Sequence, residues 1–321
     1  MTVSKPAPGG NVNRDVDLEF GPAPVKSNSP DDSRASRTSL ILASYNIRYA
    51  VGSPLISSGI LRKLGINFPL NRNEAVLRNV RTAAQLFDEG RLLPRPDILA
   101  LQEADKETAR AGGVHVARAL ATALAMNWVH APAGIPRGTP PKTRQWWLDF
   151  EEQIGLNDSG DTGVALLSDL PLKDVARIDL PWRECAWRPR LAIAATTSIS
   201  GIDLRIYNAH IDPHPDAEGQ LEQLEAILEL ADQYTGPVIV MGDFNTLSAQ
   251  KSRDTRNLME RRGYSTPFPT GTDTWRGAGL RFHADWIFGR KINFSDWGVA
   301  NPLGVSDHWP IWAKVELPLV T

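Results

Sequence analysis

Several apolar stretches of this chain end in side chains that can bind a metal ion, hold a phosphate or move a proton. The stretch Val238-Ile-Val-Met-Gly-Asp-Phe-Asn245, for example, runs directly into Asp243 and Asn245. Six segments carry such residues at strand ends or in the loops beside them, and the residues are Asn46, Glu103, His210, Asp243, Asn245, Asp285, Asp307 and His308. Taken singly, each is more often structural: a turn or cap residue, a surface carboxylate such as Glu103, or a hydrogen-bonded histidine such as His210. Together they predict one site at the strand ends of a rigid sheet.

The residue types indicate which chemistry such a site would perform. Carboxylates and carboxamides without a cysteine cluster favour Mg²⁺ or Mn²⁺ as the cofactor over a structural zinc ion. Two histidines beside the cation would donate hydrogen bonds to phosphate oxygens, and an aspartate would fix the tautomer of one of them. The set therefore predicts hydrolysis of a phosphoester by direct attack of water.

The composition is that of a globular protein with little charge bias. The 321 residues are 42% hydrophobic and 22% charged, with a formal net charge of −2. No overall positive field marks nucleic acid or an anionic membrane as the partner, although a local basic groove remains open. Cys185 is the single cysteine, which excludes an intrachain disulfide framework. With no evident signal peptide and no long apolar run, a cytoplasmic protein without a transmembrane segment is expected.

The elements that must position these residues can be placed from the apolar pattern. Residues 1–38 are rich in Pro, Ser, Gly and Asp and are predicted to form a disordered tail, followed by a domain over 39–318. Predicted strands cover 39–46, 97–103, 163–168, 191–199, 202–209, 238–241, 283–288, 291–298 and 311–317. Predicted helices comprise one capped by Asn73 and ended by Gly90, and others over 113–126, 216–231 and 252–262. Helices and strands alternate in part of the chain, which indicates an α/β protein.

Two predicted loops interrupt this pattern. The longer one, 131–160, carries basic residues and an adjacent tryptophan pair: Arg137, Lys142, Arg144, Trp146 and Trp147. A loop of this length is usually functional or disordered, and it is read here as an insertion that faces the substrate. Its tryptophans would equally suit a satellite hydrophobic cluster. The second loop, 266–279, contains Trp275.

Five segments, taken in order, resemble the motifs of the endonuclease/exonuclease/phosphatase superfamily, the DNase I-like hydrolases. They are Ser44-Tyr-Asn-Ile, Leu101-Gln-Glu, Asn208-Ala-His, Gly242-Asp-Phe-Asn and Ser306-Asp-His. Ala284-Asp-Trp-Ile-Phe is similar to a further segment of that family, and the resemblance spans about Ser39 to Leu317. It implies a four-layered α/β sandwich, in which two mostly antiparallel central sheets are flanked by helices.

The resemblance implies a metal side and a phosphate side. Glu103 would be the principal metal ligand, with Asn46 and Asp307 beside it. Arg48 stands where some relatives have another metal-side carboxylate, so a second metal is not expected and Arg48 becomes a substrate-binding candidate. The segment Thr162-Gly163-Val164 lacks the Gly-Asn pair of many relatives, which transfers phosphate binding to Arg190 or to the 137–144 loop.

The catalytic roles follow from the same resemblance. Asp243 would position or deprotonate the attacking water, and Asn245 would orient that water or hold a phosphate oxygen. His210 and His308 would bind the scissile phosphate, with Asp285 orienting His308.

The substrate stays open at this stage. A nuclease would need a basic groove with aromatic platforms, which the 131–160 loop would supply. The acidic net charge favours a small phosphomonoester, an inositol phosphate or a lipid head group instead. A catalytically silent binding protein on the same fold is the competing class, but every matched motif position carries a competent side chain. No obligate protein partner is evident.

Overall fold

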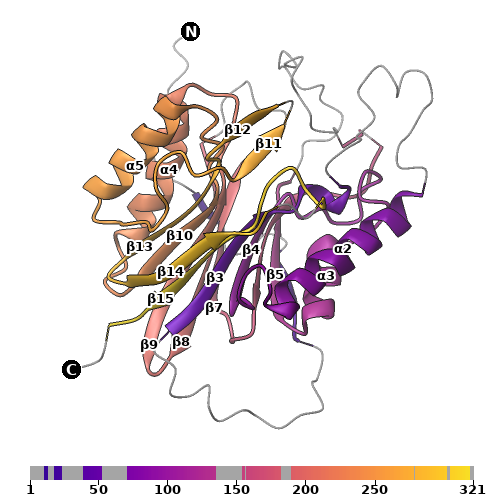
Figure 1. Cartoon of the computed structure of the whole chain (residues 1–321), viewed down its shortest axis with the longest axis horizontal. Coiled ribbons are helices and arrows are strands. Elements are labelled where there is room, and N and C mark those ends of the chain that lie inside the picture. The colour runs from indigo at the N-terminus through magenta and orange to yellow at the C-terminus, as the bar shows by residue number, and fades with distance from the viewer. Residues whose placement is uncertain are drawn as a thin grey trace.

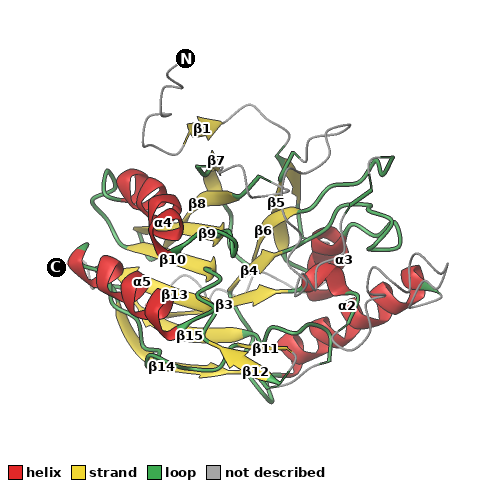
Figure 2. Ribbon diagram, turned by 90° about the horizontal axis from the view of Figure 1, so that it is seen from above, coloured by secondary structure: helices red, strands yellow, loops and turns green. Residues whose placement is uncertain are grey.

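The computed structural model describes residues 11–13, 18–23, 39–52, 71–134, 154–155, 157–181, 189–277, 279–301 and 304–318. Two large β-sheets lie face to face at the centre, and helices cover the outer face of each (Figures 1 and 2). Among the helices in these ranges, none has both the length and the apolar character needed to cross a bilayer.

The first sheet has six strands. In spatial order they are β1 (Asn11–Asn13), β7 (Lys173–Asp179), β8 (Leu191–Ile199), β9 (Ile202–His210), β10 (Val238–Asp243) and β13 (Asp285–Arg290). All neighbours are antiparallel except β9 and β10, which run parallel. A parallel pair needs a crossover connection, and α4 (Ala217–Ala231) provides it between these two strands.

The second sheet has seven strands and repeats this arrangement. In spatial order they are β14 (Asn293–Val299), β15 (Ile311–Glu316), β3 (Ser39–Asn46), β4 (Ile98–Gln102), β6 (Gly163–Ser168), β5 (Asn127–Pro132) and β2 (Glu19–Gly21). Only β3 and β4 are parallel, and α2 (Arg72–Glu89) connects them. A two-stranded sheet of β11 (Trp275–Gly277) and β12 (Leu280–Phe282) completes the set.

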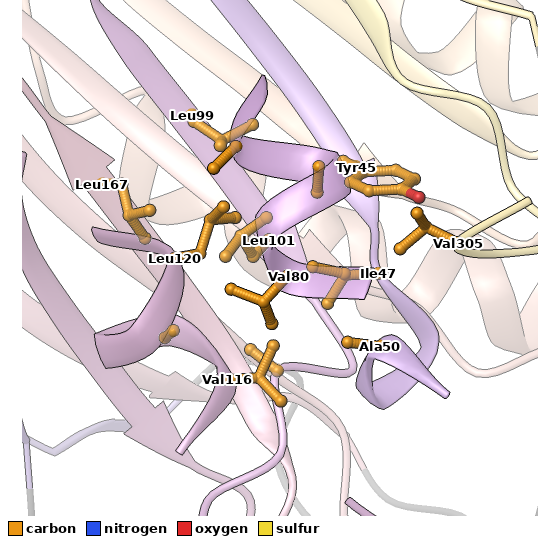
Figure 3. Packing of buried hydrophobic residues seen from close by; sticks show 14 of the residues in the cluster. Tyr45, Ile47, Ala50, Val80, Leu99, Leu101, Val116, Leu120, Leu167 and Val305 are labelled. Carbon is orange, nitrogen blue, oxygen red and sulfur yellow. The ribbon is translucent and has the colours of Figure 1, made fainter. Parts of the chain in front are cut away.

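The central strands are continuous apolar runs because both of their faces are buried. In β4, Ile98 and Ala100 face the cluster between the sheets, whereas Leu99 and Leu101 face the helices. Figure 3 shows Leu99 and Leu101 with Val80, Val116 and Leu120 in the outer cluster. Full burial of such an aliphatic side chain contributes about 1.5–3 kcal/mol to stability.

The same alternation recurs in β10 and gives the fold its layers. Ile239 and Met241 join the cluster between the sheets, whereas Val238 and Val240 join the outer cluster beneath α4 and α5 (Ala249–Arg261). On the other side, α2 and α3 (Val116–Leu124) cover the seven-stranded sheet. Three apolar clusters therefore separate four layers, and the expected α/β sandwich with two mostly antiparallel sheets is confirmed.

Local sequence signals set most helix boundaries. Asp216 caps α4 by accepting a hydrogen bond from Gly219 N at 2.9 Å. Gly90 ends α2 in the left-handed conformation, at φ 65°. The expected cap at Asn73 is wrong, because α2 begins at Arg72 and the Asn73 side chain donates to Gly112 O at 2.9 Å.

Several strands were not expected from the sequence. The prediction of a disordered tail over 1–38 is wrong for Asn11–Asn13 and Glu19–Gly21, which pair with β7 and β5. Both are short, and their pairing depends on sheet edges supplied by distant parts of the chain. β5, β7, β11 and β12 were also missed. The predicted insertion over 131–160 begins inside β5, and its basic residues and tryptophan pair lie outside the described residues.

Candidate active site

Three of the predicted site residues stand in one row across the six-stranded sheet. In the strand register Asp243 is the Cα partner of His210 on one side and of Asp285 on the other. Side chains that are paired in this way project from the same face of a sheet. That face is the inner one, since Ile239 and Met241 on the same strand are packed between the sheets. The alternation of side chains that places Ile239 and Met241 in the core therefore also points these three polar side chains between the sheets.

Asp243 Oδ2 is the point on which these side chains converge. It accepts a hydrogen bond from Asn46 Nδ2 at 2.9 Å, and Asn46 belongs to the opposite sheet. His210 Nε2 lies 3.5 Å from the same oxygen and His308 Nε2 lies 3.7 Å from it. Burial raises the pKa of Asp243 to about 7, with Asp285 acting in the same direction, against the opposing effects of His308 and of the hydrogen bonds from Asn46 and Asn245. Asp243 is thus a carboxylate poised to take a proton near neutral pH.

His308 lies between two carboxylates. Its Nδ1 donates to Asp285 Oδ2 at 2.9 Å, while Nε2 faces Asp243. Burial lowers the pKa of His308, but the charges of Asp285 and Asp243 outweigh it and raise that pKa to about 10. The imidazole is therefore cationic at neutral pH. Thr274 Oγ1 fixes the start of β13 by accepting from Asp285 N at 2.9 Å.

Arg190 brings a second positive charge to the site, beside His210. Arg190 Nη1 lies 2.9 Å from Nε2 and 3.1 Å from Nδ1 of His210, so the guanidinium lies directly against the imidazole. Both residues are buried. The structure therefore brings Arg190, which was expected to bind substrate, next to one of the two predicted phosphate-binding histidines.

The seven-stranded sheet positions its residues through turns. Glu103 follows β4 directly and has a φ of 51°, which points its side chain towards His210 Nε2, 3.9 Å from Oε1. Asn46 Oδ1 accepts a hydrogen bond from Arg48 N at 3.0 Å. Arg48 has a φ of 44° and places Nη1 3.6 Å from Asp307 Oδ2. Asn46 thus lies at the end of β3, whereas Glu103 and Arg48 lie on turns at the same end of the sheet.

Asn245 is held close to the backbone. Its side chain donates from Nδ2 to Ile211 O at 2.8 Å, and its backbone N donates to Asp243 Oδ1 at 2.9 Å. These two contacts secure the turn that ends β10. The carboxamide nitrogen is therefore engaged in a structural hydrogen bond.

Two further contacts support the site and were not foreseen as functional. Gln102 and Asn208 bridge the sheets just behind it, with Nε2 of Gln102 donating to Oδ1 of Asn208 at 2.7 Å. Trp275 Nε1 donates to Asp307 Oδ2 at 3.1 Å. The role of Asn208 could have been predicted from the sequence, because a buried amide in an apolar strand needs hydrogen-bond partners for its polar atoms. No local signal connects Trp275 with Asp307.

Gly242 lies where two paired strands approach each other closely. A Cβ at this position would lie 2.0 Å from Ala209 O on the paired strand β9, and the φ of Gly242 is 140°. Strand pairing alone therefore requires glycine at this position.

Comparisons with known proteins agree with the geometry. The model of the endonuclease/exonuclease/phosphatase family matches residues 43–308. A comparison with curated proteins finds no match by sequence. Among solved structures, the endonuclease/exonuclease/phosphatase from Beutenbergia cavernae DSM 12333 has a TM-score of 0.60 and 16% identity, over 88% of this chain and 72% of that one.

Two other structures share the fold at similarly low identity. ANGEL2, a 2',3'-cyclic phosphatase in complex with adenosine-2',3'-vanadate, has a TM-score of 0.56 and 14% identity, over 96% of this chain and 99% of that one. A mannosyl-6-phosphatase from Bacteroides thetaiotaomicron VPI-5482 has a TM-score of 0.52 and 17% identity, over 87% and 100%. The family match covers most of the chain, and the fold agrees with it. The chain therefore belongs to the endonuclease/exonuclease/phosphatase family.

Proposed function

We propose that the protein is a divalent-metal-dependent phosphoesterase that cleaves its substrate by direct attack of water. The observation that carries this proposal is the convergence of Asn46, His210 and His308 on Asp243 Oδ2. A buried carboxylate beside two imidazoles is suited to activating a water molecule next to a bound anion. Family membership supports the same reaction class.

The donor set fits Mg²⁺ or Mn²⁺ on the side of the seven-stranded sheet. Glu103 and Asp307 offer carboxylates, and Asn46 Oδ1 accepts one backbone hydrogen bond, leaving a lone pair for a cation. These three residues would hold the ion, which when bound would draw negative charge from the phosphate oxygens. The Arg48 guanidinium, 3.6 Å from Asp307, already adds a positive charge there and supports a single metal ion.

Asp243, Asp285 and His308 form another group whose ligand atoms lie within 4.8 Å of one another. We assign this group to proton transfer and phosphate binding. His308 Nδ1 already donates to Asp285, and the raised pKa keeps the ring cationic, so it would repel a metal ion. The same positive charge suits the oxygens of a phosphate.

The remaining residues divide the work on the substrate. Asp243 takes a proton from the attacking water, and Asn245 orients that water or a phosphate oxygen. His210, His308 and Arg190 hold the other phosphate oxygens, since each brings a donor to the same end of the site. Asp285 keeps His308 in the orientation that this requires.

A substrate panel tests the proposal. Plasmid DNA, short RNA, an aryl phosphodiester, inositol phosphates and sphingomyelin are each incubated with the protein in Mg²⁺, Mn²⁺ or EDTA. Release of phosphate or cleavage that EDTA abolishes is the expected result for at least one of them. The panel also includes a 2',3'-cyclic nucleotide and a sugar 6-phosphate, because the names of two fold relatives mention such substrates. Absence of EDTA-sensitive cleavage of every substrate would favour a binding protein.

A further inference from the structure

A second cluster of metal-ligating side chains lies at the edge of the seven-stranded sheet formed by β5 and β2. It consists of Glu19 on β2, His115 at the start of α3 and His130 on β5, with one ligand atom from each within 4.8 Å of the other two. The rings of His115 and His130 are 5.1 Å apart between centroids. Glu19 therefore meets two histidines from a distant part of the chain, and the three form one group of nitrogen and oxygen donors.

His130 has a buried ring nitrogen that lacks a hydrogen-bond partner among the described residues. It is fully buried, and its Nε2 donates to Ala104 O at 2.7 Å. That contact leaves Nδ1 as the acceptor nitrogen, and Nδ1 is buried with no hydrogen-bond partner among the described residues. A ring with Nε2 as its donor and Nδ1 as its acceptor is neutral, as a metal ligand must be. A ligating histidine typically donates its other nitrogen to a backbone carbonyl, as this one does.

An ordinary ion-pair network accounts for only part of the cluster. Glu19 Oε2 lies 2.9 Å from His115 Nε2, and Glu19 Oε1 is paired with Lys106 Nζ. These contacts explain why Glu19 and His115 are together. They give no partner to His130 Nδ1, and leaving a buried polar nitrogen unpaired destabilises the folded state.

We propose that Glu19, His115 and His130 bind a divalent transition-metal ion of the zinc type. Two imidazoles and one carboxylate form a ligand set that Zn²⁺ accepts, with a fourth position open to solvent. The Glu19 side chain is 27% exposed, which provides that opening. Ligation through His115 Nε2 requires that nitrogen to lose its proton, with the ring taking the Nδ1–H form. That change sacrifices the 3.3 Å contact from Arg118 N to Nδ1, which is long for a hydrogen bond.

Such an ion would connect β2 to the segment that carries Glu103 of the candidate active site. Ala104 O accepts from His130, and Lys106 pairs with Glu19, so the cluster contacts the segment that directly follows Glu103. The expected consequence is a higher melting temperature for the metal-bound protein, since a ligand that binds only the folded state stabilises it.

The test uses the full chain stripped with a chelator and then titrated with Zn²⁺. Bound zinc per chain and the zinc-dependent melting shift are compared for wild type, Glu19→Gln, His130→Gln and the control Glu107→Gln. Glu107 is an exposed carboxylate next to Lys106, which pairs with Glu19. Wild type and the control should bind one more zinc ion per chain than Glu19→Gln, or bind it at least about tenfold more tightly, because even an outer-shell partner of a metal site contributes 10–100-fold.

Glu19→Gln decides the question if His130→Gln fails to fold, because Glu19 is half-buried on an edge strand. Counting zinc ions per chain separates this site from the active site, which all four proteins retain. Equal stoichiometry, affinity and melting shift in wild type and Glu19→Gln would overturn the proposal. Its failure would leave the phosphoesterase proposal untouched, because the substrate panel is read with Mg²⁺ and Mn²⁺.

Discussion

The two central sheets deliver their residues to the candidate active site in different ways. In the six-stranded sheet, His210, Asp243 and Asp285 are neighbours in one register row of three paired strands. In the seven-stranded sheet only Asn46 lies within a strand, whereas Glu103 and Arg48 lie on turns with positive φ. The first arrangement is fixed by the whole ladder of hydrogen bonds, and the second by the conformation of single residues.

This difference predicts different kinds of sensitivity. A register slip of one residue would turn the whole row of His210, Asp243 and Asp285 away from the site, so these positions share the rigidity of the core. A turn residue depends on its local backbone and can be altered with less effect on the fold. Substitutions on the six-stranded side should therefore change the chemistry, and those on the seven-stranded side should change metal affinity.

The largest effect is expected from replacing Asp243. Asp243→Asn and Asp243→Ala should lower kcat roughly 10²–10⁴-fold, since that is what a general base contributes. The measurement is the turnover of the best substrate from the panel, with circular dichroism to verify folding. Near wild-type turnover in a folded variant would refute the assignment of Asp243.

Asp243→Asn also has a stability signature. The pKa of Asp243 is raised by burial to about 7, so its contribution to the free energy of unfolding is full at low pH and is lost as the pH rises through that value. Asparagine does not titrate. The melting temperature of the variant should therefore fall less than that of wild type between pH of about 5 and about 8.

A smaller effect is expected at Glu103, on the turn side. Glu103→Gln should raise the Mg²⁺ or Mn²⁺ concentration needed for half-maximal activity roughly 10–100-fold, with little change in melting temperature. Metal titrations of activity measure this, with Glu107→Gln as the control from the same loop. An unchanged metal requirement would place the cation elsewhere, with the Asp243, Asp285 and His308 group as the next candidate.

Asp285 should act through the pKa of His308. Wild-type kcat/KM should rise with pH through about 7, as Asp243 ionises, and fall near 10, as His308 loses its proton. Asp285→Asn removes a charge that raises the pKa of His308, so the alkaline limb should move to lower pH. If the pH profile keeps its alkaline limb in place, Asp285 does not control His308.

The smallest change is expected at Trp275. Trp275→Phe keeps an aromatic ring against Phe282 but removes the hydrogen bond to Asp307 Oδ2. Loss of such a bond costs about 0.5–1.5 kcal/mol, or up to roughly tenfold in apparent metal affinity. Trp297→Phe, at an exposed tryptophan, serves as the control. A larger loss of kcat than of metal affinity would move Trp275 to the substrate side.

Much of the fold could be predicted from the sequence, because its central strands are continuous apolar runs. The runs at 39–46, 163–168 and 191–199 were predicted with the bounds that the structure shows. The weakly patterned β7 and the short β2 were missed, because their strand conformation depends on partners far away in the sequence. The predicted loop over 266–279 contains β11, which pairs with β12, and its Trp275 contacts Asp307.

The sequence by itself determined which residues stand at strand ends and which face of each strand they share. Because side chains alternate between the two faces of a strand, Asn46 and Asp243 point to the same face as the apolar residues that stand an even number of positions before them. This is local geometry. Only the tertiary structure decided that these two inner faces meet, so that Asn46 donates to Asp243. Within the seven-stranded sheet, it also decided that β2 pairs with β5 and brings Glu19 to His115 and His130. Contacts between sheets depend on packing across the core, which no local periodicity encodes.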